Sequence, residues 1–260
     1  DINLALLYPL NVLYFFLAPF QALTAGVLVH FMVALIGMYI FTRSITLSRI
    51  ASVLAAVIFG FSGTMVTYTN NVPMLQVASL LPWVLWGIRQ YMLIPSRKTF
   101  VIATLLASMQ VIAGHPQLTY YTWLLTGALI VWELTRSDPV RKGKDLIKIL
   151  LRLGILIVFI FLVTAVQILP FLEFARLSTR VGRGFEYAAF DSLHPLSFIR
   201  FIIPNIVGVL RDGTAWARGG SVYGYTGVIS LLLGFVASGN NRVVRVLSFA
   251  GVVWVLMALG

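Results

Sequence analysis

Three short polar breaks, each containing a proline, interrupt an otherwise apolar sequence. Residues 114–117 read Gly-His-Pro-Gln, residues 8–11 read Tyr-Pro-Leu-Asn, and residues 203–205 read Ile-Pro-Asn. In an apolar chain, irregular backbone is tolerated where it borders protein or water, so the breaks predict the lining of one cavity. The side chains that could bind a ligand there are Tyr8, Asn11, His115, Gln117 and Asn205.

The break around His115 has the residue types of a helix-to-helix corner. Gly114 permits the turn, and Pro116 suits the first turn of the next helix. The turn requires neither His115 nor Gln117, and both side chains can bond sugar hydroxyls or phosphate oxygens. The alternative is that His115 only caps the next helix. His30 is a weaker candidate, because a lone histidine within an apolar run more often bonds a neighbouring helix.

Residues 171–222 form a long connection that contains arginine but no lysine. Arginine binds phosphate or carboxylate through a planar fork, whereas lysine offers a point charge. Two interpretations stay open: the arginines pair with carboxylates of the same connection, or at least one binds phosphate, with Arg176 and Arg180 favoured. Glu173 is an acid beside them, and Tyr223 could stack on a sugar ring or anchor the chain at a membrane surface.

The elements that position these residues are predicted to be membrane-spanning helices. The chain has 260 residues, of which 60% are hydrophobic and 10% charged, and its mean hydropathy is +0.95. This composition predicts an all-α polytopic bundle with no soluble domain. The net charge of +11 does not indicate nucleic-acid binding, because no hydrophilic domain carries it. Cysteine is absent, which excludes disulfides and thiolate metal sites.

Apolar runs of the length that a bilayer requires predict about eight spans in a single transmembrane domain. They cover residues 21–42, 50–68, 74–93, 99–113, 117–135, 146–169, 223–238 and 243–260. Residues 6–20 contain Pro9 and Pro19 and predict a short re-entrant or interfacial helix. The chain starts without methionine and stops within an apolar run, so we interpret it as a fragment of a longer protein.

The predicted connections alternate between basic and uncharged, which indicates the orientation of the spans. Basic connections hold Arg43 and Arg49, then Arg89, Arg97 and Lys98, then Arg136, Arg141, Lys142, Lys144 and Lys148, and last Arg242 and Arg245. Residues 69–73 and 114–117 contain no lysine or arginine. By the positive-inside rule the basic connections are cytoplasmic, so the proline breaks and residues 171–222 lie outside. The pattern predicts a multi-pass protein of a bacterial cytoplasmic membrane whose active face is extracytoplasmic.

Several runs resemble the bacterial YfhO-like membrane proteins. They are residues 7–11, 29–39, 43–63, 113–117, 165–173, 203–205 and 223–227, with the Ala-Gly-His-Pro-Gln run at 113–117 the strongest. The likeness extends over nearly the whole chain. That family is placed in the GT-C class of membrane glycosyltransferases, so the resemblance implies transfer of a sugar from a polyprenyl-phosphate donor to an acceptor outside the membrane. It also implies a catalytic acid in the first outer loop, either Asp1 or a residue before it.

Two other functions fit the same pattern. A transporter or flippase for a lipid-linked substrate would use the cavity without a catalytic acid, and a scaffold for envelope assembly would tolerate substitution of its polar residues. ATP-binding, dinucleotide-binding, zinc-protease and serine-hydrolase motifs are absent from the sequence. The sequence predicts no specific cofactor or metal site.

Overall fold

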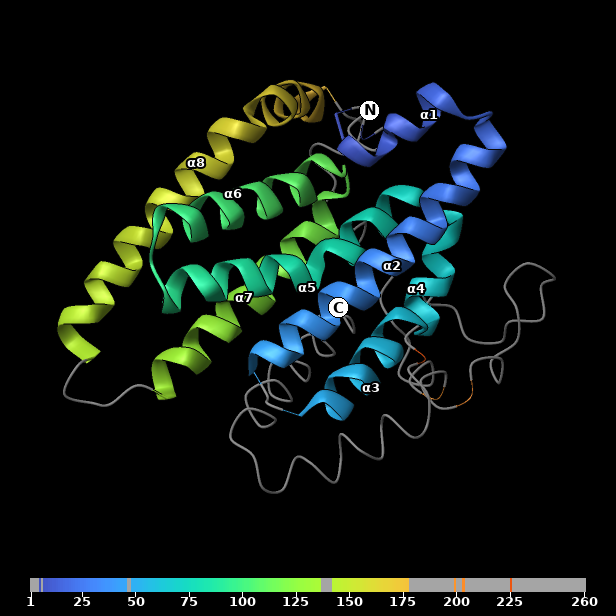
Figure 1. Cartoon of the computed structure of the whole chain (residues 1–260). Coiled ribbons are helices and arrows are strands. Elements are labelled where there is room, and N and C mark those ends of the chain that lie inside the picture. The colour runs from blue at the N-terminus through green and yellow to red at the C-terminus, as the bar shows by residue number, and fades with distance from the viewer. Residues whose placement is uncertain are drawn as a thin grey trace. The chain divides into compact units, whose positions relative to one another are not determined.

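The computed structural model describes residues 5, 7–45, 48–136 and 142–177, with residues 199, 203 and 225. All regular structure in these residues is helical, as the sequence predicts. The chain divides into two compact units, Asp1–Gly60 with Tyr68–Arg176, and Phe61–Thr67 with Leu177–Gly260. The first unit contains every described helix except α4 (Figure 1).

In the first unit, two short turns precede the long helices. They are η2 (Pro9–Val12) and α1 (Leu13–Phe16), and an extended Leu17 ends them before Pro19 starts the next helix. The other elements are α2 (Pro19–Ile45), α3 (Arg49–Gly60), η3 (Tyr68–Asn70), α5 (Val72–Leu93), α6 (Arg97–Ile112), α7 (Pro116–Arg136) and α8 (Lys142–Arg176). In the second unit, α4 (Gly63–Thr67) begins where the Gly63 N–H donates to the Tyr225 carbonyl at 2.7 Å.

Four described helical stretches are long and apolar enough to cross a membrane, which supports the membrane prediction. They are Pro19–Ile45, Arg49–Asn70, Val72–Leu93 and Ile147–Arg176, the second of which is interrupted after Gly60. Helices also occupy the predicted spans at 99–113 and 117–135, but α6 has only 16 residues and α7 does not reach the same apolarity. The predicted spans at 223–238 and 243–260, and most of the connection at 171–222, lie outside the described residues. A count of eight therefore stays a prediction.

Helices α2, α5 and α7 run in one direction, and α6 and α8 run in the opposite one. Arg89, near the end of α5, contacts Ser44 and Glu133 near the ends of α2 and α7. Gln110, near the end of α6, contacts α5 and α7 near their starts. We name the two ends by these contacts: the polar end holds the starts of α5 and α7 with the ends of α6 and α8, and the basic end is the opposite one.

The described basic residues gather at one end of these helices, and one predicted position is wrong. All described lysines and arginines except Arg176 lie at or near the basic end. They lie in the last turns of α2 and α7, just before the last turn of α5, or in the first third of the helices that start there. Arg89 is not in a connection as predicted. It lies inside α5 and is buried, because Glu133 on α7 neutralises it. Which end faces the cytoplasm stays a prediction.

Small residues allow α2 and α5 to approach closely. The Trp83 indole Nε1–H donates to the Val33 carbonyl at 2.8 Å, and the indole fills the space beside Gly37. A Cβ at Gly37 would lie 2.5 Å from Trp83 Cδ1, which is closer than atoms can pack. Glycine is therefore required where the indole crosses α2.

We expect Gly37→Ala to lower the free energy of unfolding by about 1–3 kcal/mol, because the added methyl group displaces the Trp83 ring and breaks its bond to Val33. Unfolding in mixed micelles with increasing anionic detergent measures the change. Gly26→Ala on the same helix is the matched control, since nothing lies within 4 Å of a Cβ there. Equal stability of the two variants would contradict the packing described.

Candidate functional site

The polar end begins with a hydrogen bond that ties the N-terminal turns to α2. The Tyr8 side chain is 1% exposed, and its hydroxyl lies 2.9 Å from His30 Nε2. His30 Nδ1 lies 2.6 Å from the Gly26 carbonyl and must donate to it, so Nε2 accepts the proton of Tyr8. Burial raises the pKa of Tyr8 well above its ordinary value, so the phenol stays protonated. Tyr8 and His30 thus form a closed structural contact.

A second tie joins the same turns to α5. The Asn11 amide Nδ2 donates to the Ala5 carbonyl at 2.8 Å, which leaves Oδ1 facing α5. The Gln76 amide Nε2 donates to this Oδ1 at 2.8 Å. Because a carbonyl can only accept, the first bond sets the orientation of both amides. Gln76 Oε1 is then left buried with no hydrogen-bond partner among the described residues.

A third amide lies deeper between α5, α6 and α7. Gln110 is fully buried, and its Nε2 donates to the Val77 carbonyl at 3.1 Å and to Thr122 Oγ1 at 2.9 Å. The bond to a carbonyl again sets the orientation, so Gln110 Oε1 is a second buried acceptor without a described partner. Buried acceptors normally receive a hydrogen bond. The two glutamine oxygens near the polar end could therefore accept one from water or from a ligand hydroxyl.

At the corner between α6 and α7, His115 caps a helix and also keeps one ring nitrogen for a ligand. Gly114 adopts φ 87°, the left-handed conformation that glycine permits. His115 Nδ1 accepts the Leu118 N–H at 3.3 Å, so the ring caps α7. Its Nε2 has no hydrogen-bond partner among the described residues and can meet a ligand. Gln117 is exposed and donates to the Tyr121 hydroxyl at 2.8 Å.

The cap makes stability depend on pH. Burial lowers the pKa of His115 from its ordinary value of 6.5, so the folded protein favours the neutral ring. The stabilisation that the cap gives is present above about pH 6.5. It is lost as the pH falls, because a protonated Nδ1 cannot accept the Leu118 N–H. We expect the free energy of unfolding to decrease below this pH more steeply in the native protein than in His115→Asn, whose side chain caps without titrating. Identical pH profiles would contradict the assignment.

Helix α8 brings an acid and a base to the same end. Gln167 Nε2 donates to the Ile112 carbonyl at 3.3 Å, which fixes the end of α8 beside the end of α6. Glu173 and Arg176 follow six and nine residues later on the same helix. Both are exposed, and neither forms an ion pair with a described residue. Within the described residues, the Arg176 guanidinium therefore stays without an acidic partner at the polar end.

Two of the three predicted breaks come together. Tyr8 and Ala113, which precedes Gly114, belong to one hydrophobic cluster with Val77 and Leu80 of α5. Leu10 and Leu118, which lie close in sequence to Asn11 and His115, pack against this cluster. The predicted residues Asp1, Arg180, Asn205 and Tyr223 lie outside the described residues, so their place in the site stays a prediction.

Sequence reasoning did not select Gln76, Gln110 or the pair of Arg89 and Glu133. The two glutamines occur inside apolar runs, where an amide needs a partner, and that is the signal which could have identified them. Arg89 Nε lies 2.5 Å from Glu133 Oε1, and its Nη1 donates to the Ser44 carbonyl at 2.9 Å. This buried pair lies at the basic end and joins three helices.

Comparison with known proteins finds no matching family model, curated protein or solved structure. The site is therefore interpreted from its own geometry. Within the described part of the chain, no three histidine, aspartate or glutamate side chains gather as metal ligands would. What the described residues offer at the polar end is an exposed guanidinium, an exposed carboxylate, an imidazole nitrogen and several amides. This is a set suited to a phosphate and a hydroxylated group.

Proposed function

We propose that this protein is a membrane glycosyltransferase that takes a sugar from a polyprenyl-phosphate donor and passes it to an acceptor outside the cytoplasmic membrane. The observation that carries the proposal is the gathering of hydrogen-bonding side chains at the polar end, away from nearly all of the described lysines and arginines. The resemblance of the sequence to YfhO-like proteins points to the same class.

Each group has a role in this reaction. Arg176 holds the lipid phosphate, aided by Arg180, while His115 Nε2 and Gln117 orient the donor sugar. The acceptor hydroxyl oxygen attacks the anomeric carbon as the bond from that carbon to the phosphate oxygen breaks. A carboxylate, Asp1 or an acid before it, takes the hydroxyl proton, and the polyprenyl phosphate leaves with the bonding electron pair. Glu173 is the acid beside the phosphate site.

Tyr8 and Asn11 have a supporting part in this proposal. Their side chains bond to His30 and Gln76, so they hold the floor of the site in place. In this proposal Asn205 and Tyr223 also bind the sugar, and the tyrosine ring stacks on it. The donor tail, being apolar, would lie against the lipid-facing surface of the bundle.

The test uses the purified full-length protein in liposomes, supplied with polyprenyl-phosphate hexoses labelled in the sugar and with an envelope fraction as acceptor. Transfer of label is expected from the native protein and from Arg49→Ala, whose side chain is exposed at the basic end. His115→Ala combined with Arg176→Ala is expected to abolish transfer. Full activity in this double variant would sink the assignment.

The transporter alternative is favoured by one observation. The buried residues Thr119, Thr122, Thr126 and Glu133 follow each other along one face of α7, from the polar end to the basic end. Such a stripe is compatible with passage of a polar headgroup, although each of the three threonines also donates to the carbonyl four residues before it. Movement of a labelled lipid-linked sugar across the liposome, without transfer to any acceptor, would identify transport.

A further inference from the structure

A hollow of about 380 Å³ lies at the basic end, between the α5–α6 connection and α8. Its lining consists of Tyr91, Pro95, Ser96, Arg97, Phe100, Ile155 and Phe159. The aromatic side chains form a continuous wall, because the rings of Tyr91 and Phe100 lie 5.5 Å apart and those of Phe100 and Phe159 lie 5.1 Å apart. Arg97 is the charged residue of the lining. The lining is thus mostly aromatic and aliphatic, and it includes one cationic side chain.

The charge around this hollow is one-sided. Arg97 and Lys98 are exposed and form no ion pair with a described residue, and Arg152 lies one turn before Ile155 on α8. Glu133, an acid at this end, is already paired with Arg89. The N-terminal N–H groups of α6 are satisfied in part by its own cap, through Ser96 and Thr99. Arg97 is the side chain of the lining that can pair with an anion.

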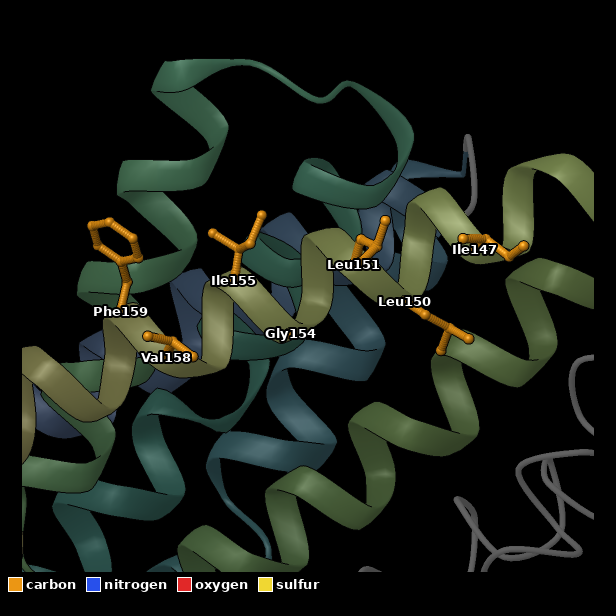
Figure 2. Close-up of a pocket in the computed structure, with 7 residues that line it drawn as sticks. All are labelled: Ile147, Leu150, Leu151, Gly154, Ile155, Val158 and Phe159. Atoms are coloured by element: carbon orange, nitrogen blue, oxygen red, sulfur yellow. The ribbon is translucent and has the colours of Figure 1, made fainter.

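An apolar surface continues directly from the hollow. A second hollow of about 540 Å³ is lined by residues of α8, namely Ile147, Leu150, Leu151, Gly154, Ile155, Val158 and Phe159 (Figure 2). The two hollows share Ile155 and Phe159. Beyond Phe159 the same side of α8 carries Leu162 and Val166, both more than half exposed. A cationic recess is therefore joined to an apolar track along one helix.

We infer that this recess binds the phosphodiester headgroup of an anionic phospholipid, with Arg97 on the phosphate and an acyl chain along α8. Two features identify the occupant: the charge is complementary to a phosphate, and the adjoining track is complementary to a hydrocarbon chain. A free phosphate would use only the recess. A zwitterionic lipid would bind more weakly than an anionic one, because it carries no net negative charge to interact with the surplus of cations. The site is separate from the polar end and does not rest on the proposed glycosyltransferase function.

Native mass spectrometry of the purified full-length protein, released from nanodiscs that contain equal phosphatidylglycerol and phosphatidylcholine, tests the inference. We expect retained phosphatidylglycerol in the native protein and in Arg49→Gln, about tenfold less in Arg97→Gln, and an intermediate amount in Arg97→Lys. Unchanged unfolding temperatures show that the variants are folded, as expected for an exposed side chain. Glycerol 3-phosphate is added as the competitor without an acyl chain.

The inference would be overturned by equal retention of phosphatidylcholine, by retention that Arg97→Gln does not change, or by displacement of the lipid by millimolar glycerol 3-phosphate. The last would mean that the recess recognises phosphate alone. Loss of retention in Arg49→Gln to the same degree would mean that general charge, and not the recess, attracts the lipid.

Discussion

Replacing Glu133 with alanine is expected to lower the free energy of unfolding by about 3–5 kcal/mol, more than the other substitutions proposed for this protein. Glu133 and Arg89 are 9% and 7% exposed, and removal of the carboxylate leaves a buried guanidinium without its counter-charge. Unfolding in mixed micelles measures the loss.

The companion variant separates the charge from the packing. Arg89→Met combined with Glu133→Leu removes both charges and keeps apolar volume, so stability should return to within about 1–2 kcal/mol of the native protein. The remaining difference reflects the Ser44 carbonyl, which loses its donor. If the double variant were as unstable as Glu133→Ala, the pair would not be the reason for the loss. If Glu133→Ala were neutral, the ion pair would not form in the folded protein.

The second large effect concerns binding of a polyprenyl phosphate. Arg176→Ala is expected to weaken the affinity roughly 10- to 100-fold, the equivalent of losing one charged hydrogen-bonded contact of about 1.5–3 kcal/mol. Arg176→Lys keeps the charge but not the fork, so it should fall between the alanine variant and the native protein. Isothermal titration of the full-length protein in detergent measures the dissociation constants. Arg176 is exposed at the end of α8, so neither variant should affect folding.

Arg49→Ala serves as the control for that measurement. It also removes one exposed arginine, but from the start of α3 at the basic end. The affinity of this variant should stay within about twofold of the native value, because salt screens a charge at the opposite end of the bundle. A similar loss of affinity in both alanine variants would show that binding of the lipid phosphate depends on net charge and that Arg176 has no specific role.

The sequence predicted helix positions well because hydropathy and proline mark them directly. Pro19 and Pro116 each stand at the first residue of a helix, as their missing N–H allows, and Gly114 supplies the left-handed turn between α6 and α7. The interruption after Gly60 was not predicted. Residues 50–68 contain no charged residue, and hydropathy does not report where a helix is interrupted.

The candidate site was predicted only in part, because a residue's type does not reveal its partner. Tyr8 and Asn11 lie at the same end of the bundle as His115, yet their hydrogen bonds to His30 and Gln76 depend on contacts between distant segments. Arg89 illustrates the same limit. Its charge suggested a connection between spans, and only the position of Glu133 on α7, 44 residues later, allows it to be buried.

Photolabelling tests most directly whether the polar end holds a lipid-phosphate-linked sugar. The full-length protein is illuminated with a polyprenyl-phosphate sugar that carries the photoreactive group on the sugar, and the labelled peptides are sequenced with and without excess natural lipid. We expect competed labelling in residues 7–17, 110–121 or 167–177, the described segments of the polar end. Competed labelling confined to residues 89–100 or 142–155 at the basic end would contradict the proposed site.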